Sequence, residues 1–133
     1  MVDATLVSAE NRMQFLPKFF GCNLMLVGEE LVYNWMKRLS ADYKKGEWRY
    51  YELSNGGFYM APSTDTHMRV KVIGNYYFGN ISSDAAGIVA TMFALEYLAL
   101  EFPSQDSFIN LHNLLGDFIL DHPESKEIFR ALD

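Results

Sequence analysis

The sequence has little that would support a disulfide framework, a metal cluster or catalysis. Its 133 residues include one cysteine, Cys22, which excludes an intramolecular disulfide and any zinc or iron–sulfur site built from several cysteines. It lacks a glycine-rich phosphate loop, a dinucleotide fingerprint, a Gly-x-Ser-x-Gly nucleophile motif and a His-Glu-x-x-His zinc motif. The three histidines are far apart in the chain. We therefore expect no enzyme activity, no catalytic residues, no cofactor and no metal.

The sequence also lacks a long hydrophobic run. Its most apolar stretch, residues 85–100, is shorter than the roughly 20 residues of a membrane span and is interrupted by Gly87 and Glu96. The N-terminus has no basic segment followed by an apolar one, the pattern of a secretory signal. We expect a cytoplasmic protein with no membrane partner.

Basic side chains are scarce. The chain has 11 lysines and arginines against 17 acidic residues, a formal net charge of −6. Proteins that bind duplex DNA usually show a basic excess, so we expect no stable duplex binding. The charge is uneven, because residues 1–81 carry 8 acids and 9 bases whereas residues 82–133 carry 9 acids and 2 bases. This division predicts an acidic helical layer against a mildly basic sheet layer.

The rest of the composition is that of a packed globule. Half of the residues are hydrophobic and 15% are aromatic, and the length suits one domain. We expect a single domain over residues 1–133 and a monomer, since no pattern indicates a coiled coil. Residues 1–11 show no periodicity and are expected to fray.

Periodicity predicts a helix first and strands next. Apolar residues recur at helical spacing over 29–39, with acids leading and bases trailing, whereas residues 15–21 predict only a short turn or a single helical turn. Residues 47–62 contain two β-favouring runs around Asn-Gly-Gly, the pattern of a hairpin. A second pair of strands is predicted over 68–81. Together they predict an antiparallel β-meander of about four strands.

The C-terminal part of the sequence is predicted to form helices. A buried helix is predicted from Asp84 to Glu101, with a second helix after Ser104 or Asp106 and a last one opened by Pro123. Helix, strands and then a run of helices is the order of an α+β domain. We expect a single compact domain in which the meander packs against a helical layer.

The aromatic residues of the predicted strands leave two interpretations open. Because strands alternate faces, one set of rings enters the core and the other faces outward. If Tyr51 and Tyr59 faced outward beside the basic residues Arg49, Arg69 and Lys71, the sheet would suit single-stranded nucleic acid. If they are covered, they belong to the core. An exposed aromatic face would also suit a protein partner.

The Asn-Gly-Gly link has a structural and a functional interpretation. It provides the backbone freedom of a tight hairpin, and on that view replacing Asn55 with glycine costs little stability. It would also present Asn55 and its neighbours to a partner. The candidate partner-binding residues are Trp48, Tyr51, Asn55, Tyr59 and Asp84.

Other residues that could carry chemistry have simpler interpretations. His112 lies on an apolar helix face and is expected at the edge of the core, and His122 precedes a proline where capping explains it. Cys22 follows an apolar run and is expected to be small and buried. Glu96 interrupts an apolar helix, so it either pairs with a sheet base such as Arg69 or marks an exposed stripe.

Several sequence blocks, spread in order over residues 12–133, resemble the KlcA/ArdB family of antirestriction proteins. They are Phe-Leu-Pro-Lys-Phe-Phe-Gly at 15–21, Leu-Val-Tyr-Asn-Trp-Met at 31–36, Tyr-Glu-Leu-Ser-Asn-Gly-Gly-Phe-Tyr-Met-Ala-Pro at 51–62, Gly-Asn at 79–80, Ser-Asp-Ala-Ala-Gly-Ile at 83–88 and His-Pro-Glu with the C-terminal residues at 122–133. The resemblance implies a small cytoplasmic α/β protein of plasmids, phages or genomic islands that relieves type I restriction. It implies no cofactor and no known catalytic residues.

Mimicry of DNA is one way to inhibit a restriction enzyme, and the charge of this chain argues against it. B-DNA carries one charge per about 1.7 Å, so a mimic of about ten base pairs needs about twenty ordered negative charges. The chain has 17 acids with 11 bases among them. We expect a non-catalytic antirestriction protein that is not a full DNA mimic. Its partner is expected to be the host type I restriction machinery or a factor acting with it. The alternative is a module that binds single-stranded nucleic acid through an aromatic and basic sheet face.

Overall fold

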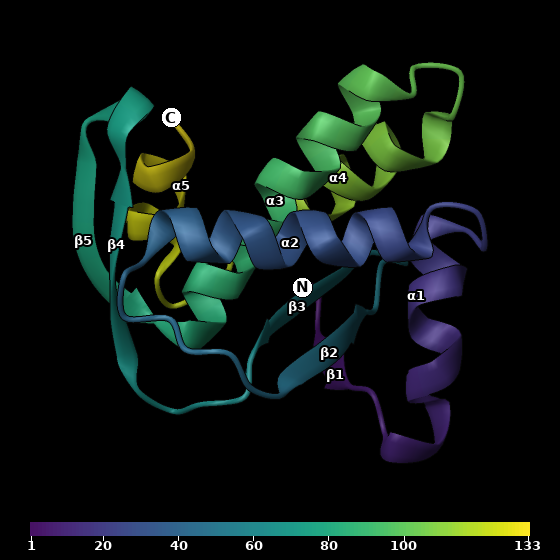
Figure 1. Cartoon of the computed structure of the whole chain (residues 1–133), viewed down its shortest axis with the longest axis horizontal. Helices are drawn as coiled ribbons and strands as arrows, with labels where there is room; N and C mark the ends of the chain where they lie inside the picture. Colours follow the sequence, from purple (N-terminus) through teal and green to yellow (C-terminus); the bar gives the residue numbers. More distant parts are fainter.

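The computed structural model describes all residues, 1–133, and contains five α-helices and two antiparallel sheets (Figure 1). In chain order the elements are β1 (Ala4–Leu6), η1 (Ala9–Asn11), α1 (Arg12–Phe20), α2 (Met25–Leu39), β2 (Trp48–Leu53), β3 (Phe58–Pro62), β4 (His67–Val72), η2 (Ile73–Asn75), β5 (Tyr77–Ser82), α3 (Ser83–Glu101), α4 (Asp106–Ile119) and α5 (Ser125–Leu132), where η1 and η2 are 3₁₀ turns. The predicted α+β class is confirmed.

The four predicted strands are present, but they do not form one meander. β2 and β3 pair with β1 in the order β1-β2-β3, whereas β4 and β5 form a separate hairpin. The break follows from the connection between β3 and β4. Pro62 ends β3 and has no N–H to extend the ladder, and the hydroxyls of Thr64 and Thr66 hydrogen-bond to each other at 2.9 Å and turn the chain. The expectation of one continuous sheet is corrected to a three-stranded sheet and a separate hairpin.

The first residues are paired with the sheet. β1 lies antiparallel to β2. The Ser54 N–H donates to the Asp3 carbonyl at 2.8 Å, and the Asp3 N–H donates to the Ser54 hydroxyl at 2.9 Å. Residues 4–6 therefore form an edge strand where the sequence predicted none.

α3 is the central helix of the fold, and its residues are buried almost all round. By length and composition it would pass for a membrane span, but 67% of that apolar window is buried inside the protein. α3 packs on β3 at Gly87, where a Cβ atom would overlap the main chain of Met60 and the Cα atom of Ala61. The apolar stretch of the sequence is thus a core helix.

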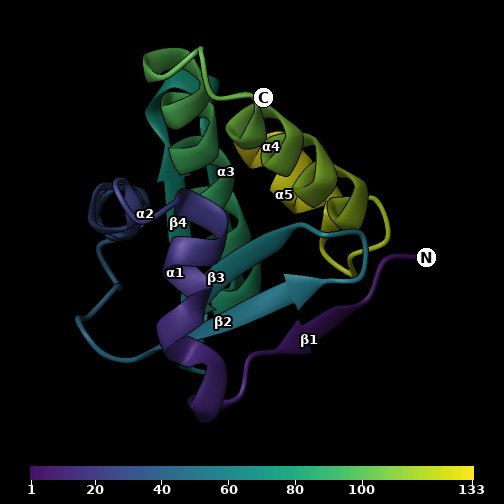
Figure 2. The ribbon, with the colours of Figure 1, turned by 90° about the vertical axis from the view of Figure 1, so that its right-hand side faces the viewer.

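Helices cover both sides of α3. Figure 2 shows α1 and α2 on one side of it and α4 and α5 on the other. α1 is a full nine-residue helix where the sequence predicted a single turn, because Phe15, Phe19 and Phe20 all pack on the ring of Phe58. Cys22 is exposed, which corrects its expected burial, because it lies in the turn after α1 rather than on the packed face.

Candidate functional site

Asp84 is the centre of a hydrogen-bond network at the start of α3. Ser82 caps this helix by accepting the N–H of Ala85 at 3.0 Å, which places the Asp84 carboxylate in the first turn. Its Oδ1 accepts the Tyr59 hydroxyl at 2.7 Å, and its Oδ2 lies 2.9 Å from Nε2 of His122. The Asp84 side chain is 37% exposed and that of His122 is 7% exposed. The carboxylate is therefore held in place but still reaches solvent.

Both ring nitrogens of His122 are occupied. The main-chain N–H of Glu124 donates to Nδ1 at 2.9 Å, so Nδ1 carries no proton and Nε2–H donates to Asp84. This arrangement defines a neutral imidazole in a single tautomer. His122 holds a turn and orients a carboxylate, and neither nitrogen is free to take a proton from a substrate.

A second contact ties the same turn to α3. Glu124 Oε1 accepts the main-chain N–H of Ser82 at 2.9 Å, and Glu124 Oε2 accepts the Ser82 hydroxyl. The segment before α5 is thus joined to the start of α3 by His122 and by Glu124. These bonds make the Asp84 region rigid.

Stacked rings support Asp84 from below. Tyr51 stacks on Tyr59 with ring centroids 4.7 Å apart, and Tyr59 stacks on Phe118 at 5.6 Å. Burial, followed by the neighbouring Asp84 carboxylate, raises the pKa of both Tyr59 and Tyr51 above the usual tyrosine value. Both hydroxyls therefore stay protonated at neutral pH, and Tyr59 remains a donor to Asp84.

A polar cavity of about 160 Å³ opens beside the carboxylate. Tyr51, Asp84, Arg49 and Asp65 line it, and Arg49 pairs with Asp65 at 3.2 Å. We call these four residues the Asp84 surface. The chain has no group of three or more histidine, cysteine, aspartate or glutamate side chains arranged to hold a metal ion. The Asp84 surface offers one part-exposed carboxylate and a half-buried tyrosine, which suits binding of a polar or basic group.

The five candidate residues do not form one cluster. Tyr51, Tyr59 and Asp84 lie together. Tyr59 is only 2% exposed, so it contributes by its bond to Asp84 and its stack on Tyr51 and not by contact with solvent. Trp48 is buried at the other end of β2, where its Nε1–H donates to Tyr43 at 3.1 Å. Asn55 Nδ2 donates to the Leu114 carbonyl at 2.9 Å, and its Oδ1 accepts Gly57 N–H at 2.9 Å. Trp48, Tyr59 and Asn55 therefore brace the fold.

The predicted aromatic and basic face of Tyr51 and Tyr59 does not exist in that form. Tyr59 is in the core, and Arg69 and Lys71 belong to the separate β4–β5 hairpin. Arg69 pairs with Asp42 at 2.6 Å and Glu96 is exposed, so of the two options for Glu96 the structure shows the exposed stripe. The cause is again the division of the strands into two sheets.

The contact between His122 and Asp84 escaped the sequence interpretation. Both residues lie at predicted helix starts, and that was the available signal, because the ends of packed helices often meet at one edge of a domain. Capping was the expected role of His122. In the structure its side chain binds across 38 residues to the first turn of another helix.

Comparison with known proteins agrees with the resemblance. The family model described as "Antirestriction protein" matches residues 41–133. Two Escherichia coli proteins called antirestriction protein KlcA are similar, one 46% identical over 99% of this chain and 95% of its own length, the other 47% identical over 98% of this chain and 92% of its own length. The uncharacterized protein YafX of Escherichia coli K12 is 32% identical over 97% of this chain and 86% of its own length.

A solved structure shares the fold. It is described as belonging to the KlcA and ArdB proteins, with a novel fold and antirestriction activity against type I DNA restriction systems in vivo but not in vitro. It matches with a TM-score of 0.92 and 47% sequence identity, covering 99% of this chain and 95% of that chain. By sequence and by fold, the chain belongs to the KlcA/ArdB family of antirestriction proteins.

Proposed function

We propose that this chain relieves type I restriction of incoming plasmid or phage DNA in the cytoplasm by binding a protein. The partner is the host type I restriction machinery or a factor that acts with it. The mechanism involves no catalysis and no mimicry of a full DNA duplex. The Asp84 surface is the proposed contact, and the protein acts as a monomer.

The state of His122 is the observation that carries the non-catalytic mechanism. A general base needs a nitrogen free to accept a proton from the reacting group. In this chain Nδ1 of His122 accepts Glu124 N–H and Nε2 is directed at Asp84. The Asp84 oxygens are themselves engaged by Tyr59 and His122. The network therefore supports a binding role, in which charge and shape are held fixed for a partner.

The distribution of acidic residues supports the second part of the proposal. Residues 82–133 hold 9 acids, including Asp84 and Glu124, which are tied into the network, and Glu127, which pairs with Arg130 at 3.1 Å. A mimic of about ten base pairs would need about twenty ordered charges. The acidic helices could therefore contact a basic surface of a partner, over an area smaller than a ten-base-pair duplex.

Tyr51 and Asp84 are the proposed contact residues. Tyr51 is half-buried and Asp84 is part-exposed, and both line the same cavity. Tyr59 belongs to the proposal as the residue that positions Asp84, whereas Trp48 and Asn55 stabilise the fold away from this surface. A tyrosine and a carboxylate held by neighbours are suited to an interface because little conformational entropy is lost on binding.

The behaviour described for the related structure agrees with a cellular partner. Its antirestriction activity is described as present in vivo but not in vitro. Applied to this chain, that difference means that the cell supplies a component that a purified restriction assay lacks. A factor acting with the restriction enzyme would be such a component.

Plating of unmodified phage on a restricting host tests the Asp84 surface. Tyr51→Ala and Asp84→Asn should lower restriction relief at equal protein level, while Glu96→Gln, which removes an exposed acid from the other half of α3, should not. Asp84→Asn keeps hydrogen-bond partners for Tyr59 and His122 and removes the charge. Full relief by both Tyr51→Ala and Asp84→Asn, in folded protein, would refute this surface.

A further inference from the structure

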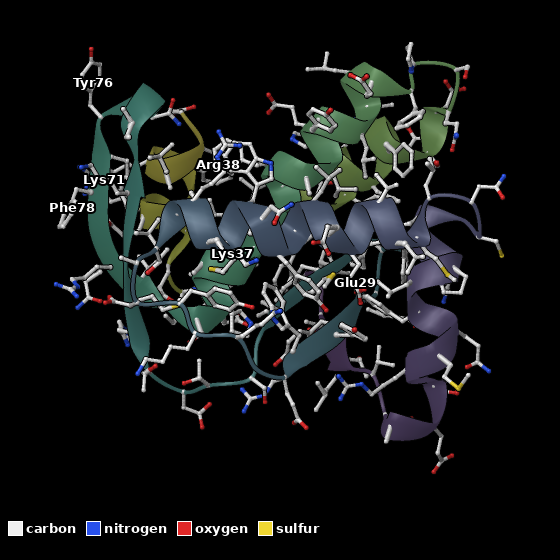
Figure 3. The ribbon with its side chains drawn as sticks, in the orientation of Figure 1. Glu29, Lys37, Arg38, Lys71, Tyr76 and Phe78 are labelled. Atoms are coloured by element: carbon white, nitrogen blue, oxygen red, sulfur yellow. The ribbon has the colours of Figure 1, made fainter.

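The β4–β5 hairpin carries aromatic rings that take no part in the core. Tyr76 is 98% exposed and Phe78 is 68% exposed. Figure 3 shows both residues at one edge of the molecule, directed away from its body. Neither ring stacks on another aromatic ring of the chain. Core packing therefore does not account for them.

The backbone conformation of Tyr76 also sets this residue apart. Its φ of 54° lies in the left-handed region, and no other non-glycine residue of the chain has a positive φ. Bulky side chains adopt this region at a cost in free energy, whereas glycine and asparagine tolerate it. Gly74 and Asn75 stand just before, yet a tyrosine occupies the strained position. A strained backbone beneath an unpacked ring is typical of a functional position.

One cation, Lys71, lies beside these rings, and a second, Arg38, lies on α2 across a groove from Lys71. Lys71 is paired with Phe78 in the strand register, so both side chains lie on the outer face of the hairpin. A groove of about 480 Å³ runs between α2 and the β4–η2 segment, with Lys71 and Arg38 among its lining residues. The Arg38 guanidinium lies 4.4 Å from the ring centroid of Trp35, which holds it in place. We call Arg38, Lys71, Tyr76 and Phe78 the hairpin face.

The charge of the hairpin face is free and positive. Neither Arg38 nor Lys71 takes part in a salt bridge. Two acids that pack against the hairpin are engaged, because Glu127 binds Tyr77 at 2.9 Å and Arg130 at 3.1 Å and Glu124 accepts the Ser82 N–H at 2.9 Å. The hairpin face thus carries two unpaired cations in a protein whose net charge is −6.

We propose that the hairpin face binds single-stranded nucleic acid. Tyr76 and Phe78 stack with bases, and Arg38 and Lys71 contact phosphates. Exposed rings beside an unpaired cation suit unpaired bases, and Ile73, which is 77% exposed, adds apolar surface next to them. Duplex DNA keeps its bases stacked inside, out of reach of both rings. This activity is independent of the Asp84 surface, because the two surfaces share no residue.

Fluorescence anisotropy with a labelled oligothymidylate of about 12 nucleotides tests the proposal. Binding should be detectable below about 100 µM protein at low salt, within the range of non-specific nucleic-acid affinities. Two phosphate contacts predict a slope of log K against log salt of about −1.4, and Lys71→Gln should reduce it by about 0.7. Tyr76→Gly should weaken binding about tenfold by removing one stacked base.

Tyr76→Gly also separates binding from folding. Glycine adopts the left-handed backbone without strain, so the thermal midpoint should not fall. Matched controls are Lys126→Gln, which removes one exposed positive charge from α5, and Tyr97→Ala, which removes an exposed ring from α3. Both should bind as the parent does.

Several outcomes would overturn the proposal. These are no anisotropy change up to about 100 µM protein, or a Tyr76→Gly variant that binds as tightly as the parent. Equal affinity for a duplex or for an abasic strand would show that bases do not stack. Tighter binding of polyglutamate than of oligothymidylate would assign the face to an acidic protein. None of these results bears on restriction relief through Tyr51 and Asp84.

Discussion

The Nε2 atom of His122 lies 2.9 Å from Oδ2 of Asp84, and this contact fastens the turn before α5 to the first turn of α3. Together with the Glu124–Ser82 contacts it closes the C-terminal helices onto the strand side of the domain. The proposed partner-binding carboxylate is therefore a product of long-range packing. Its geometry depends on two largely buried residues, His122 and Tyr59.

Removing the His122 side chain should destabilise the fold. His122→Ala leaves Asp84 and the Glu124 N–H without their partners, and we expect a loss of about 2 kcal/mol in the free energy of unfolding. His122→Asn should lose less, because an asparagine accepts the N–H two residues ahead in the same way as Nδ1 does. Urea denaturation measures both. Equal losses for the two variants would show that the bond from the Glu124 N–H contributes nothing to stability.

Replacing two helical glycines with alanine should change the stability of the protein in opposite directions. Gly87→Ala forces a Cβ atom into the main chain of Met60 on β3, so we expect a loss of about 2 kcal/mol or more. Gly116→Ala in α4 meets no atom within 4 Å and should gain about 0.5 to 1 kcal/mol from helix propensity. Thermal denaturation compares the pair. A neutral Gly87→Ala would contradict the close contact between α3 and β3.

The side chain of Asn55 should matter for stability, contrary to the expectation from the hairpin pattern. It joins the β2–β3 turn to the Leu114 carbonyl of α4. Asn55→Gly removes that bond and the bond to Gly57, and we expect a loss of about 1 to 3 kcal/mol. Asn55→Asp keeps the acceptor for Gly57 and removes the donor to Leu114, which isolates the α4 contact. An unchanged midpoint for Asn55→Gly would restore the purely local interpretation.

Tyrosine ionisation should require a higher pH in the folded protein than in the unfolded chain. Burial is the main cause that raises the pKa of Tyr33, Tyr51, Tyr59 and Tyr77, the last to about 12. A folded pKa above the unfolded value near 10 means that this stabilisation is complete below pH 10 and is lost as the pH rises through the folded pKa. Ultraviolet titration should show about half of the eight tyrosines ionised near pH 10 in urea and a smaller fraction in native protein at the same pH. Identical native and denatured curves would contradict it.

The sequence predicted the elements whose signals are local. The helix over 84–101 follows from an apolar stretch, and the hairpin over 47–62 follows from Asn-Gly-Gly. It did not predict the division of the sheet, because pairing between β3 and β4 depends on the direction of the chain after Pro62. Strand pairing of this kind depends on long-range geometry, which the periodicity of the sequence does not record.

The candidate site was predictable in part for the same reason. Aromatic strand residues and Asp84 could be selected by type, but the sequence left open whether Tyr51 and Tyr59 face the core or the solvent. In the structure Tyr59 is buried and Tyr51 is half-buried. The exposed Tyr76 and Phe78 belong to a strand pair that was predicted correctly. Their exposure depends on which helix covers the inner face, and here α5 does.

Photocrosslinking at position 51 tests the central claim most directly. A photoreactive phenylalanine replaces Tyr51 in cells that restrict incoming DNA, and the same residue at exposed position 97 is the control. We predict an adduct at position 51 that survives nuclease, contains a component of the type I machinery or a factor needed for restriction, and is absent at position 97. No adduct at position 51, or one that nuclease removes, would contradict a protein partner at the Asp84 surface.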